Sequence, residues 1–307
     1  MSIVVAILVA LAALYAAAIG LVVFFSLRPP RIPVFLSPGA FGLRQEDVVL
    51  KAFDGVRLAA WWAAPTDRPI AGVAVMAHGY VMSRSELVPL AVRLAEAGIA
   101  SLLFDFRGHG RSQGAIVTLG PRERLDVQAA VAFCRERQPG TPVAVIGSSM
   151  GAAAACLALA DDPNLAEALV LDSCYSKLVR AASGWWRLFG GPVAQVLLAP
   201  ATPIAALFSG TNPYRVDIAE CLRSSPRTPT LIFHGTADTL AVPAEAKRNL
   251  AALQEAGSAR PIARLVWLEG CQHSEGRWIR PREYESALAQ FLRDCGIGNW
   301  PTSGDGR

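Results

Sequence analysis

The chain has 307 residues and a formal net charge of +4 at pH 7, with 52% hydrophobic and 18% charged residues. This apolar content excludes disorder as a description of the whole chain, and the length excludes a small scaffold that needs disulfides or metal to fold. The charge is mild and no run of five or more Lys or Arg occurs. A nucleic-acid partner is therefore not expected.

The first segment, residues 3–27, is apolar and contains no charged side chain. As a helix it would be roughly 37 Å long, more than the roughly 30 Å hydrocarbon core of a bilayer. The run is longer than the apolar region of a cleavable signal peptide, and no Lys or Arg precedes Arg28. We therefore expect residues 1–27 to stay as a single-pass membrane anchor, with cleavage near Ala16-Ala17-Ala18 as the alternative.

Basic residues follow this segment, which favours a cytoplasmic position for the rest of the chain because such residues gather on that side of a membrane. They are Arg28, Arg31, Arg44 and Lys51. The six cysteines form no CxxC pair and lie mostly in apolar segments, so we interpret them as reduced core thiols. A zinc site is not expected.

After a linker at 28–45, the pattern predicts one α/β domain over residues 46–295, followed by a polar tail at 296–307. Apolar strands that alternate with helices predict a mainly parallel sheet covered on both faces. The predicted elements are a hairpin with its turn at Asp54-Gly55, strands at 71–77, 100–106, 142–147, 168–171, 230–233 and 264–268, and helices at 87–97, 122–137, 150–160, 244–256 and 282–294.

The segment at about 174–228 is too long for an ordinary connection and must have structure of its own. It is apolar and broken by Gly and Pro, which predicts short helices that form a cap over the carboxyl edge of the sheet. Trp185, Trp186 and Phe189 are predicted to line a substrate pocket there. The alternative is that these aromatic side chains only pack the cap against the sheet.

A GxSxG motif, residues 147–151, is centred on Ser149. A motif this short is only suggestive by itself, but here it directly follows a predicted strand and opens a predicted helix. This strand-turn-helix context is the one that a nucleophile elbow requires. Ser149 is therefore the predicted nucleophile.

A serine hydroxyl needs a base to take its proton and a carboxylate to orient the base. In folds that present a nucleophile elbow of this kind the chain order is nucleophile, acid, base, and His273 is the histidine that follows the last predicted strand. Asp238 follows the preceding strand and is the predicted acid, with a turn-capping role as its structural alternative. Asp172, directly after the strand at 168–171, is the alternative acid.

The tetrahedral intermediate needs two N–H donors. We expect one from the amide of Met150, the residue after the nucleophile, and the other from the amide of Tyr80 in the loop after the strand at 71–77. The Tyr80 side chain is alternatively a pocket wall only.

These motifs resemble those of α/β-hydrolases, in the broad group of monoglyceride lipase-like enzymes, serine aminopeptidase-like proteins and membrane-anchored bacterial esterases. The matching segments are 78–80, 104–112, 147–151, 234–238 with Val242-Pro243, and His273. The resemblance implies an eight-stranded sheet, a Ser149/Asp238/His273 triad and hydrolysis through an acyl-enzyme. In this family Asp105 and the glycines after it shape a turn, so Asp105 and His109 are expected to be structural.

The anchor and the apolar cap favour a lipid-like acyl ester or thioester as substrate, with no metal or organic cofactor. The first alternative is an aminopeptidase or oligopeptidase, which needs a pocket carboxylate for the substrate ammonium group, with Glu220 and Glu245 as candidates. The second is a membrane-tethered binding module without catalysis. Oligomeric state, acyl chain and leaving group are not predicted.

Overall fold

The computed structural model describes residues 2–224, 228–255 and 262–300. Its centre is a sheet of eight strands in the order β1-β2-β4-β3-β5-β6-β7-β8. β2 runs antiparallel to β1 and β4, and the other neighbouring pairs are parallel, which confirms the mainly parallel sheet that the sequence predicted. The strands are β1 (Arg44–Lys51), β2 (Arg57–Ala64), β3 (Gly72–Ala77), β4 (Ile99–Phe104), β5 (Val143–Ser148), β6 (Ala168–Asp172), β7 (Thr230–Gly235) and β8 (Ala263–Leu268).

Helices cover both faces of the sheet because both faces of its central strands are apolar. On β5, Val143 and Val145 belong to one buried cluster, whereas Ala144 and Ile146 belong to the other. The first face is covered by α3 (Arg124–Arg137), α4 (Met150–Asp161), α8 (Ile218–Ser224) and α9 (Pro243–Glu255), and the second by α2 (Val88–Ala95) and α11 (Pro281–Asp294).

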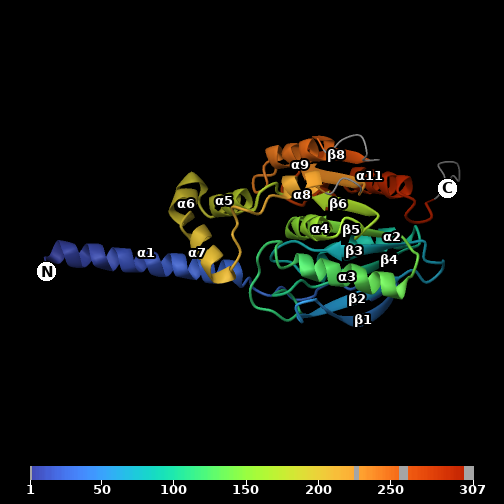
Figure 1. Ribbon diagram of the computed structural model, residues 1–307, viewed down its shortest axis with the longest axis horizontal. Helices are drawn as coiled ribbons and strands as arrows, with labels where there is room; N and C mark the ends of the chain where they lie inside the picture. The colour runs from blue at the N-terminus through green and yellow to red at the C-terminus, as the bar shows by residue number, and fades with distance from the viewer. Residues whose placement is uncertain (1, 225–227, 256–261, 301–307) are drawn as a thin grey trace.

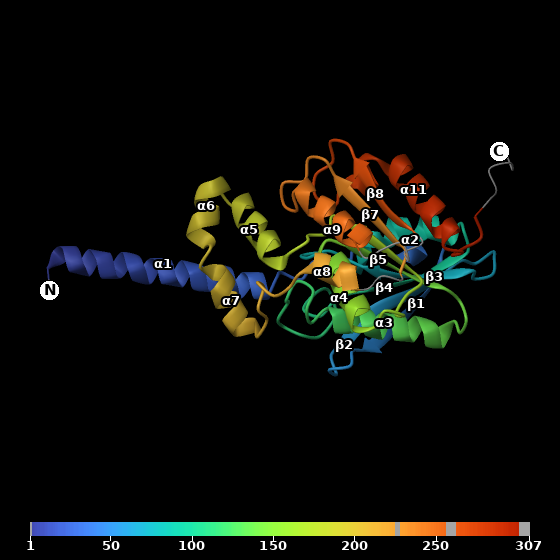
Figure 2. The ribbon, with the colours of Figure 1, turned by 45° about the horizontal axis from the view of Figure 1, so that its top comes forward.

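The N-terminal helix α1 (Ile3–Leu27) extends away from the sheet, as Figure 1 shows. It is long and apolar enough to cross a membrane, and only 11% of its most apolar window is buried. Three cap helices follow β6: α5 (Leu178–Leu188), α6 (Gly191–Leu198) and α7 (Ala201–Ser209). In both views α7 lies against the C-terminal half of α1 (Figures 1 and 2).

The predicted elements differ from the observed ones mainly at their ends. The predicted helix at 87–97 begins as a 3-10 turn, Arg84–Leu87, and continues as α2. The hairpin turn lies at Asp54-Gly55 as expected, and Gly55 takes the positive φ of 89° that glycine tolerates. The end of the predicted helix at residue 256, cap residues 225–227 and tail residues 301–307 lie outside the described residues. The domain boundaries stay predictions.

Candidate active site

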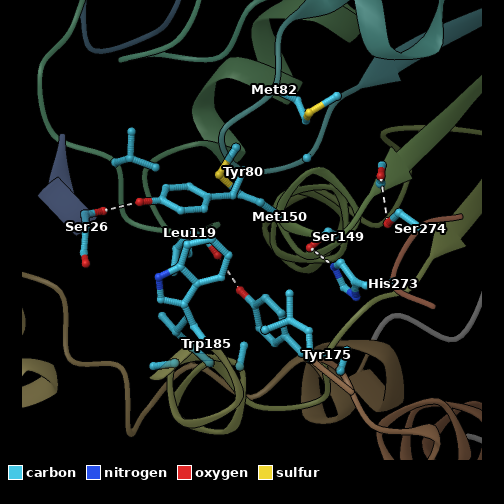
Figure 3. Close-up of a pocket in the computed structure, with 18 of the residues that line it drawn as sticks. Ser26, Tyr80, Met82, Leu119, Ser149, Met150, Tyr175, Trp185, His273 and Ser274 are labelled. Atoms are coloured by element: carbon cyan, nitrogen blue, oxygen red, sulfur yellow. Dashed lines mark hydrogen bonds between the residues drawn. The ribbon is translucent and has the colours of Figure 1, made fainter. Parts of the chain in front are cut away.

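Ser149 stands on the sharp turn between β5 and α4, with φ 49° and ψ −109°. A Cβ on Gly147 would collide with the Ala152 backbone, and one on Gly151 would collide with the Ala77 carbonyl oxygen. Glycine is therefore required at both flanks, as the motif implied. The turn points Ser149 Oγ toward His273 (Figure 3).

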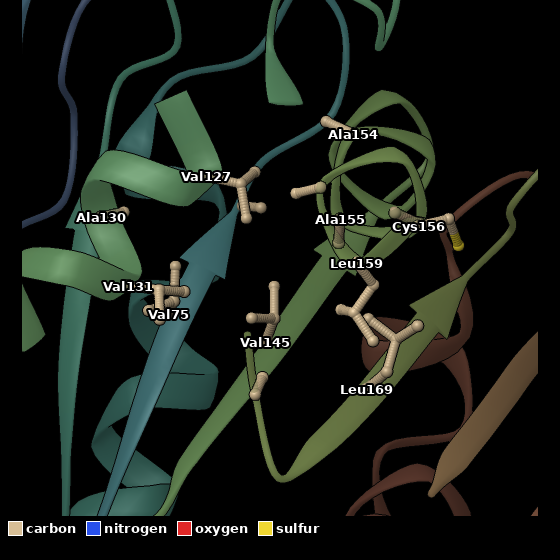
Figure 4. Close-up of a cluster of buried hydrophobic side chains, with 14 of the residues drawn as sticks. Val75, Val127, Ala130, Val131, Val145, Ala154, Ala155, Cys156, Leu159 and Leu169 are labelled. Atoms are coloured by element: carbon tan, nitrogen blue, oxygen red, sulfur yellow. The ribbon is translucent and has the colours of Figure 1, made fainter. Parts of the chain in front are cut away.

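α4 supports this turn from behind through small side chains. Ala154, Ala155 and Leu159 belong to the same buried cluster as Val145 of β5 and Leu169 of β6 (Figure 4). Ala154 and Ala155 are small enough to let the helix lie close to the sheet, so the start of α4 has little freedom to move. The position of Ser149 is thus fixed by packing as well as by the turn.

A chain of hydrogen bonds connects Ser149, His273 and Asp238. The Ser149 Oγ lies 2.8 Å from His273 Nε2, and His273 Nδ1 lies 2.8 Å from Asp238 Oδ2. An ionised carboxylate only accepts, so Nδ1 donates to Asp238 and Nε2 is left to accept the serine proton. This arrangement has the geometry needed to activate a serine hydroxyl.

Asp238 is held by its own loop. Its Oδ1 accepts hydrogen bonds from the amides of Leu240, at 2.9 Å, and Ala241, at 2.8 Å. Asp172, the alternative acid, has a different partner, because its Oδ2 accepts from Arg277 Nη1 at 2.9 Å. The structure therefore brings Asp238, and not Asp172, into hydrogen bonding with His273.

The two residues predicted to supply oxyanion donors flank the same cavity as Ser149. Met150 is the first residue of α4, and the first amides of a helix have no partner within it. Tyr80 follows β3, and its hydroxyl donates to the carbonyl of Ser26 at 2.9 Å (Figure 3). Burial raises the pKa of Tyr80, so the phenol stays protonated and remains a donor.

Backbone strain gathers around this cavity. Among the residues that the structure describes, five non-glycine residues have positive φ, and three of them, Leu119, Ser149 and Ser274, line the cavity. A fourth, Val81, follows Tyr80 directly and is β-branched, which makes the left-handed region costly. Strained conformations of this kind persist where the surrounding structure fixes them, and they are common at functional sites.

A buried ionic network that the sequence did not suggest lies beneath these residues. Arg277 donates to Asp172 at 2.9 Å and to Glu86 Oε1 at 2.5 Å. Glu86 also accepts from Ser148 Oγ at 2.8 Å and from the Gly79 amide at 2.7 Å. Glu86 thereby links the loop that carries Tyr80 to the segment that carries His273.

The pKa values of the two carboxyl groups shift in opposite directions. Burial alone would raise the pKa of Glu86, but Arg277 and the Gly79 amide hold it below its usual value. Burial raises the pKa of Asp172, and Arg277 offsets only part of that rise. The charged form of Glu86 is therefore the one that this network stabilises.

The other three histidines are buried and have structural partners. His78 Nε2 accepts from the Phe106 amide at 3.0 Å, so its Nδ1 donates to the Gly79 carbonyl at 2.7 Å. His234 Nε2 bonds to the Ala241 carbonyl at 2.6 Å, and His109 Nδ1 to the Arg107 carbonyl at 3.0 Å. Burial lowers the pKa of all three, that of His109 to about 3.

The cavity has a volume of about 440 Å³, within the usual range for small-molecule sites. Trp185 (Figure 3) and Trp186 both line it. Phe189, which was predicted to line the pocket with them, does not line this cavity: its side chain is 64% exposed and packs against Trp185, at 5.9 Å between ring centroids. The chain leaves the cavity at the end of α5, so Phe189 points to the outer surface of the cap.

Glu220 and Glu245, the candidates for binding a substrate ammonium group, lie outside the cavity. Glu220 pairs with Arg223 on the outer side of α8. Glu245 is buried at the start of α9, where its Oε2 accepts from the Ser176 amide at 2.9 Å. Asp105 and His109 also lie outside the cavity lining. Among the described residues, no group of three or more His, Cys, Asp or Glu is arranged to hold a metal ion.

Sequence reasoning also missed the walls that come from the N-terminal segment. Ser26 and Leu27 at the end of α1, and Phe35 in the linker, line the cavity together with Ser149. The linker is fixed to the domain because the Arg31 guanidinium donates to the carbonyls of Ser112, at 2.5 Å, and Gly114, at 2.9 Å. No motif marks these contacts, since their partners lie far away in the chain.

Comparisons with known proteins agree with this fold. Residues 68–210 match the family model described as serine aminopeptidase, S33. An esterase of Pyrococcus furiosus superposes with a TM-score of 0.72 at 26% identity, over 87% of this chain and 97% of that chain. The fold and these similarities define the chain as a member of the α/β-hydrolase superfamily.

Two sequence relatives extend the comparison. An uncharacterized protein of Mycobacterium tuberculosis is 28% identical over 257 residues, which cover 82% of this chain and 80% of the relative. A monoacylglycerol lipase of Mycolicibacterium smegmatis is 30% identical over 178 residues, or 57% of this chain and 60% of the relative. The chain is thus similar to hydrolases of esters.

Proposed function

We propose that the chain is a membrane-anchored serine hydrolase that cleaves carboxylic ester or thioester bonds of lipid-like acyl substrates. The observation that carries the proposal is the hydrogen-bonded chain Ser149–His273–Asp238 at an apolar cavity. The similarity to an esterase and a monoacylglycerol lipase supports an ester as the substrate bond. Basic residues after α1 favour a cytoplasmic position for the hydrolase domain.

In this mechanism His273 Nε2 takes the proton of Ser149 Oγ as that oxygen attacks the acyl carbon. The amides of Met150 and Tyr80 donate to the oxyanion of the tetrahedral intermediate. Protonated His273 then gives its proton to the departing alcohol or thiol, which leaves an acyl-enzyme. Water, deprotonated by His273, attacks the acyl carbon and releases the acid with Ser149 restored. Asp238 holds the imidazole in the required tautomer throughout.

The test of catalysis is labelling by a fluorophosphonate probe, which reacts with an activated serine without knowledge of the substrate. We expect labelling of the wild type, and its loss in Ser149→Ala and in His273→Ala. Ser286→Ala changes an exposed serine on α11 and serves as the matched control, with wild-type labelling. A folded wild type that does not react with the probe would contradict the proposal and favour a binding module.

The test of the substrate class is a series of esters with increasing acyl chain length. We expect kcat/KM to rise with chain length, because the cavity wall is largely apolar and each buried methylene contributes about 0.8 kcal/mol. Trp185→Ala should flatten this rise, since Trp185 lines the cavity. Peptide amides that are turned over faster than esters would instead support the aminopeptidase alternative, which the family-model match favours.

A further inference from the structure

The cap contains an unusually long stretch without charge. No Asp, Glu, Lys or Arg occurs from Leu188 to Tyr214, and Arg187 and Arg215 flank the stretch. Most of its large apolar side chains are on the outside, with Val193, Val196 and Leu207 69%, 73% and 80% exposed. Water-exposed surfaces of globular domains rarely present so large a continuous apolar area.

This stretch packs against α1, the helix that is long and apolar enough to cross a membrane. The Tyr15 hydroxyl donates to the Leu197 carbonyl of α6 at 2.6 Å. Ile19, Val23 and Leu27 of α1 form a buried cluster with Trp186 of α5 and Ala201 of α7. These three α1 residues are spaced by four, so one face of the helix packs on the cap over two turns.

If α1 spans a bilayer, its length places its contacts with the cap inside the hydrocarbon core. Ile3–Leu27 is about 7 Å longer than a bilayer core of roughly 30 Å. Tyr15 lies about 18 Å from Leu27 along the helix axis. Even if all the surplus length projects at the C-terminal end, Tyr15 and the Leu197 carbonyl bonded to it lie about 11 Å inside the hydrocarbon.

The cap has the properties that this depth demands. Its segments α6 and α7 are helices, so their interior backbone groups bond within the helix, as a lipid environment requires. The polar side chain of Gln195 donates to Ser183 at 2.6 Å, and Thr202 accepts from Trp186 Nε1 at 2.9 Å. α6 and α7 are bent by 46° relative to each other, and together they are long and apolar enough for a broken membrane span or a re-entrant element.

We infer that α6 and α7 lie in the hydrocarbon of the bilayer beside the C-terminal half of α1, and that the cavity receives its acyl substrate sideways from the lipid. The cavity is bounded by Leu27 of α1, by Ala205 and Ala206 of α7, and by Ser149, so it connects the embedded elements with the nucleophile. The inference rests on the proposed function, because it takes α1 to be a membrane span and the substrate to be an acyl lipid.

The first test is the reaction of single cysteines with a membrane-impermeant maleimide in phospholipid nanodiscs that hold one chain each. Val196→Cys reports on the cap, Ile7→Cys on the anchor, and Phe53→Cys, in the β1–β2 turn, on the water-exposed domain; all three native side chains are exposed. The partly exposed Cys221 and Cys295 are replaced by Ser. Both faces of a nanodisc are accessible, so membrane orientation does not affect the result.

We expect Val196→Cys and Ile7→Cys to react at least about tenfold more slowly than Phe53→Cys, because hydrocarbon excludes the reagent and suppresses the thiolate. A protected Ile7→Cys with a reactive Val196→Cys would overturn this inference and leave the anchor intact. Reaction of both would overturn the anchor as well. Protection of Val196→Cys only when two chains share a disc would identify a second copy as the cover, and would also overturn the inference.

The second test separates lipid access from chemistry. In Val196→Glu, a charge on the embedded face should lower turnover of a long-chain monoester in nanodiscs by about tenfold. Hydrolysis of a short water-soluble ester should stay at the wild-type rate, since Val196 does not line the cavity. Phe53→Glu is the matched control and should change neither rate. Equal turnover of the bilayer substrate by Val196→Glu and the wild type would contradict sideways access.

Discussion

The carboxyl edge of the sheet and the cap above it face the same cavity but are held in different ways. At the sheet edge, Ser149, His273 and Asp238 are fixed by hydrogen bonds near 2.8 Å, with strained turns and a buried ionic network beneath them. In the cap and α1, apolar contacts dominate and much of the surface is exposed. Directional bonds position reacting atoms, whereas non-directional apolar contacts permit the outer walls to move. The difference suggests that chemistry and substrate access reside in separable parts of the molecule, and variants in each part test this separation.

The largest effect is expected for Asp238→Asn, which leaves the shape of the loop but allows His273 the wrong tautomer. We predict a fall in kcat of about 10⁴-fold for long and short esters alike, because the fault lies in the proton transfer and not in access. The comparison variant is Asp172→Asn. The carboxylate of the native Asp172 accepts a hydrogen bond from Arg277 instead of from His273. A larger kcat loss in Asp172→Asn than in Asp238→Asn would reverse the assignment of the acid.

A second prediction concerns the support of the catalytic edge. Arg277→Met removes the cation between Glu86 and Asp172, whose side chains are buried. We expect the free energy of unfolding to fall by about 3–5 kcal/mol, since removing one partner leaves buried charge uncompensated. Denaturant titration of the full chain in detergent micelles measures this loss.

The matched control for that prediction is Arg93→Met, which removes an exposed arginine that pairs with Glu96 and Glu285. Its cost should stay below about 1 kcal/mol. Adding Glu86→Gln to Arg277→Met should restore part of the stability. If Arg277→Met were no more harmful than Arg93→Met, the edge would not depend on the network.

The third prediction is a pH dependence that arises at the same edge. His109 has a folded-state pKa of about 3, lowered by burial and by nearby His78. An unfolded histidine titrates near 6.5, so the unfolded state binds the extra proton as the pH falls below that value. Stability is therefore lost on acidification, by about 2 kcal/mol between pH 7 and pH 5 from this residue.

His109→Gln removes that titration, so the variant should lose less stability than the wild type over this range. Asp126 acts with the opposite sign, because burial raises its pKa to about 6 and its contribution falls as the pH rises toward neutrality. It is present in both proteins and cancels in their difference. The free energy of unfolding is measured for both proteins at pH 7 and at pH 5. If both lose the same amount between these pH values, His109 is not kept neutral by the fold.

How far the sequence predicts this molecule depends on how local each feature is. The elbow at Ser149 was predictable because strand, turn and helix follow one another within a few residues. The proximity of Asp238 and His273 followed from parallel strands, whose carboxyl ends meet at one edge. The network of Glu86 and Arg277 joins residues 191 positions apart, and neither residue belongs to a motif.

In the cap, too, the sequence predicts local structure better than it predicts contacts between distant residues. Its helices were expected from composition, but the side that each aromatic ring faces depends on tertiary packing. Trp186 is 4% exposed because α1 and α7 cover it, whereas Phe189, three residues later, has no such cover and is 64% exposed. Composition gives the number of apolar side chains and not their partners. The sequence alone therefore could not predict that the end of α1 lines the cavity.

The smallest effect is expected where the two regions meet, at Tyr80. Its amide is the proposed oxyanion donor, and its hydroxyl donates to the Ser26 carbonyl at the end of α1. Tyr80→Phe removes this one hydrogen bond, worth about 1 kcal/mol, so we expect kcat to fall by about fivefold. If the bond positions the loop of the oxyanion donor, kcat falls equally for long and short esters. A loss confined to the long-chain ester would instead show that the Tyr80 hydroxyl acts through the cap, and the two regions would then be less separable than their construction suggests.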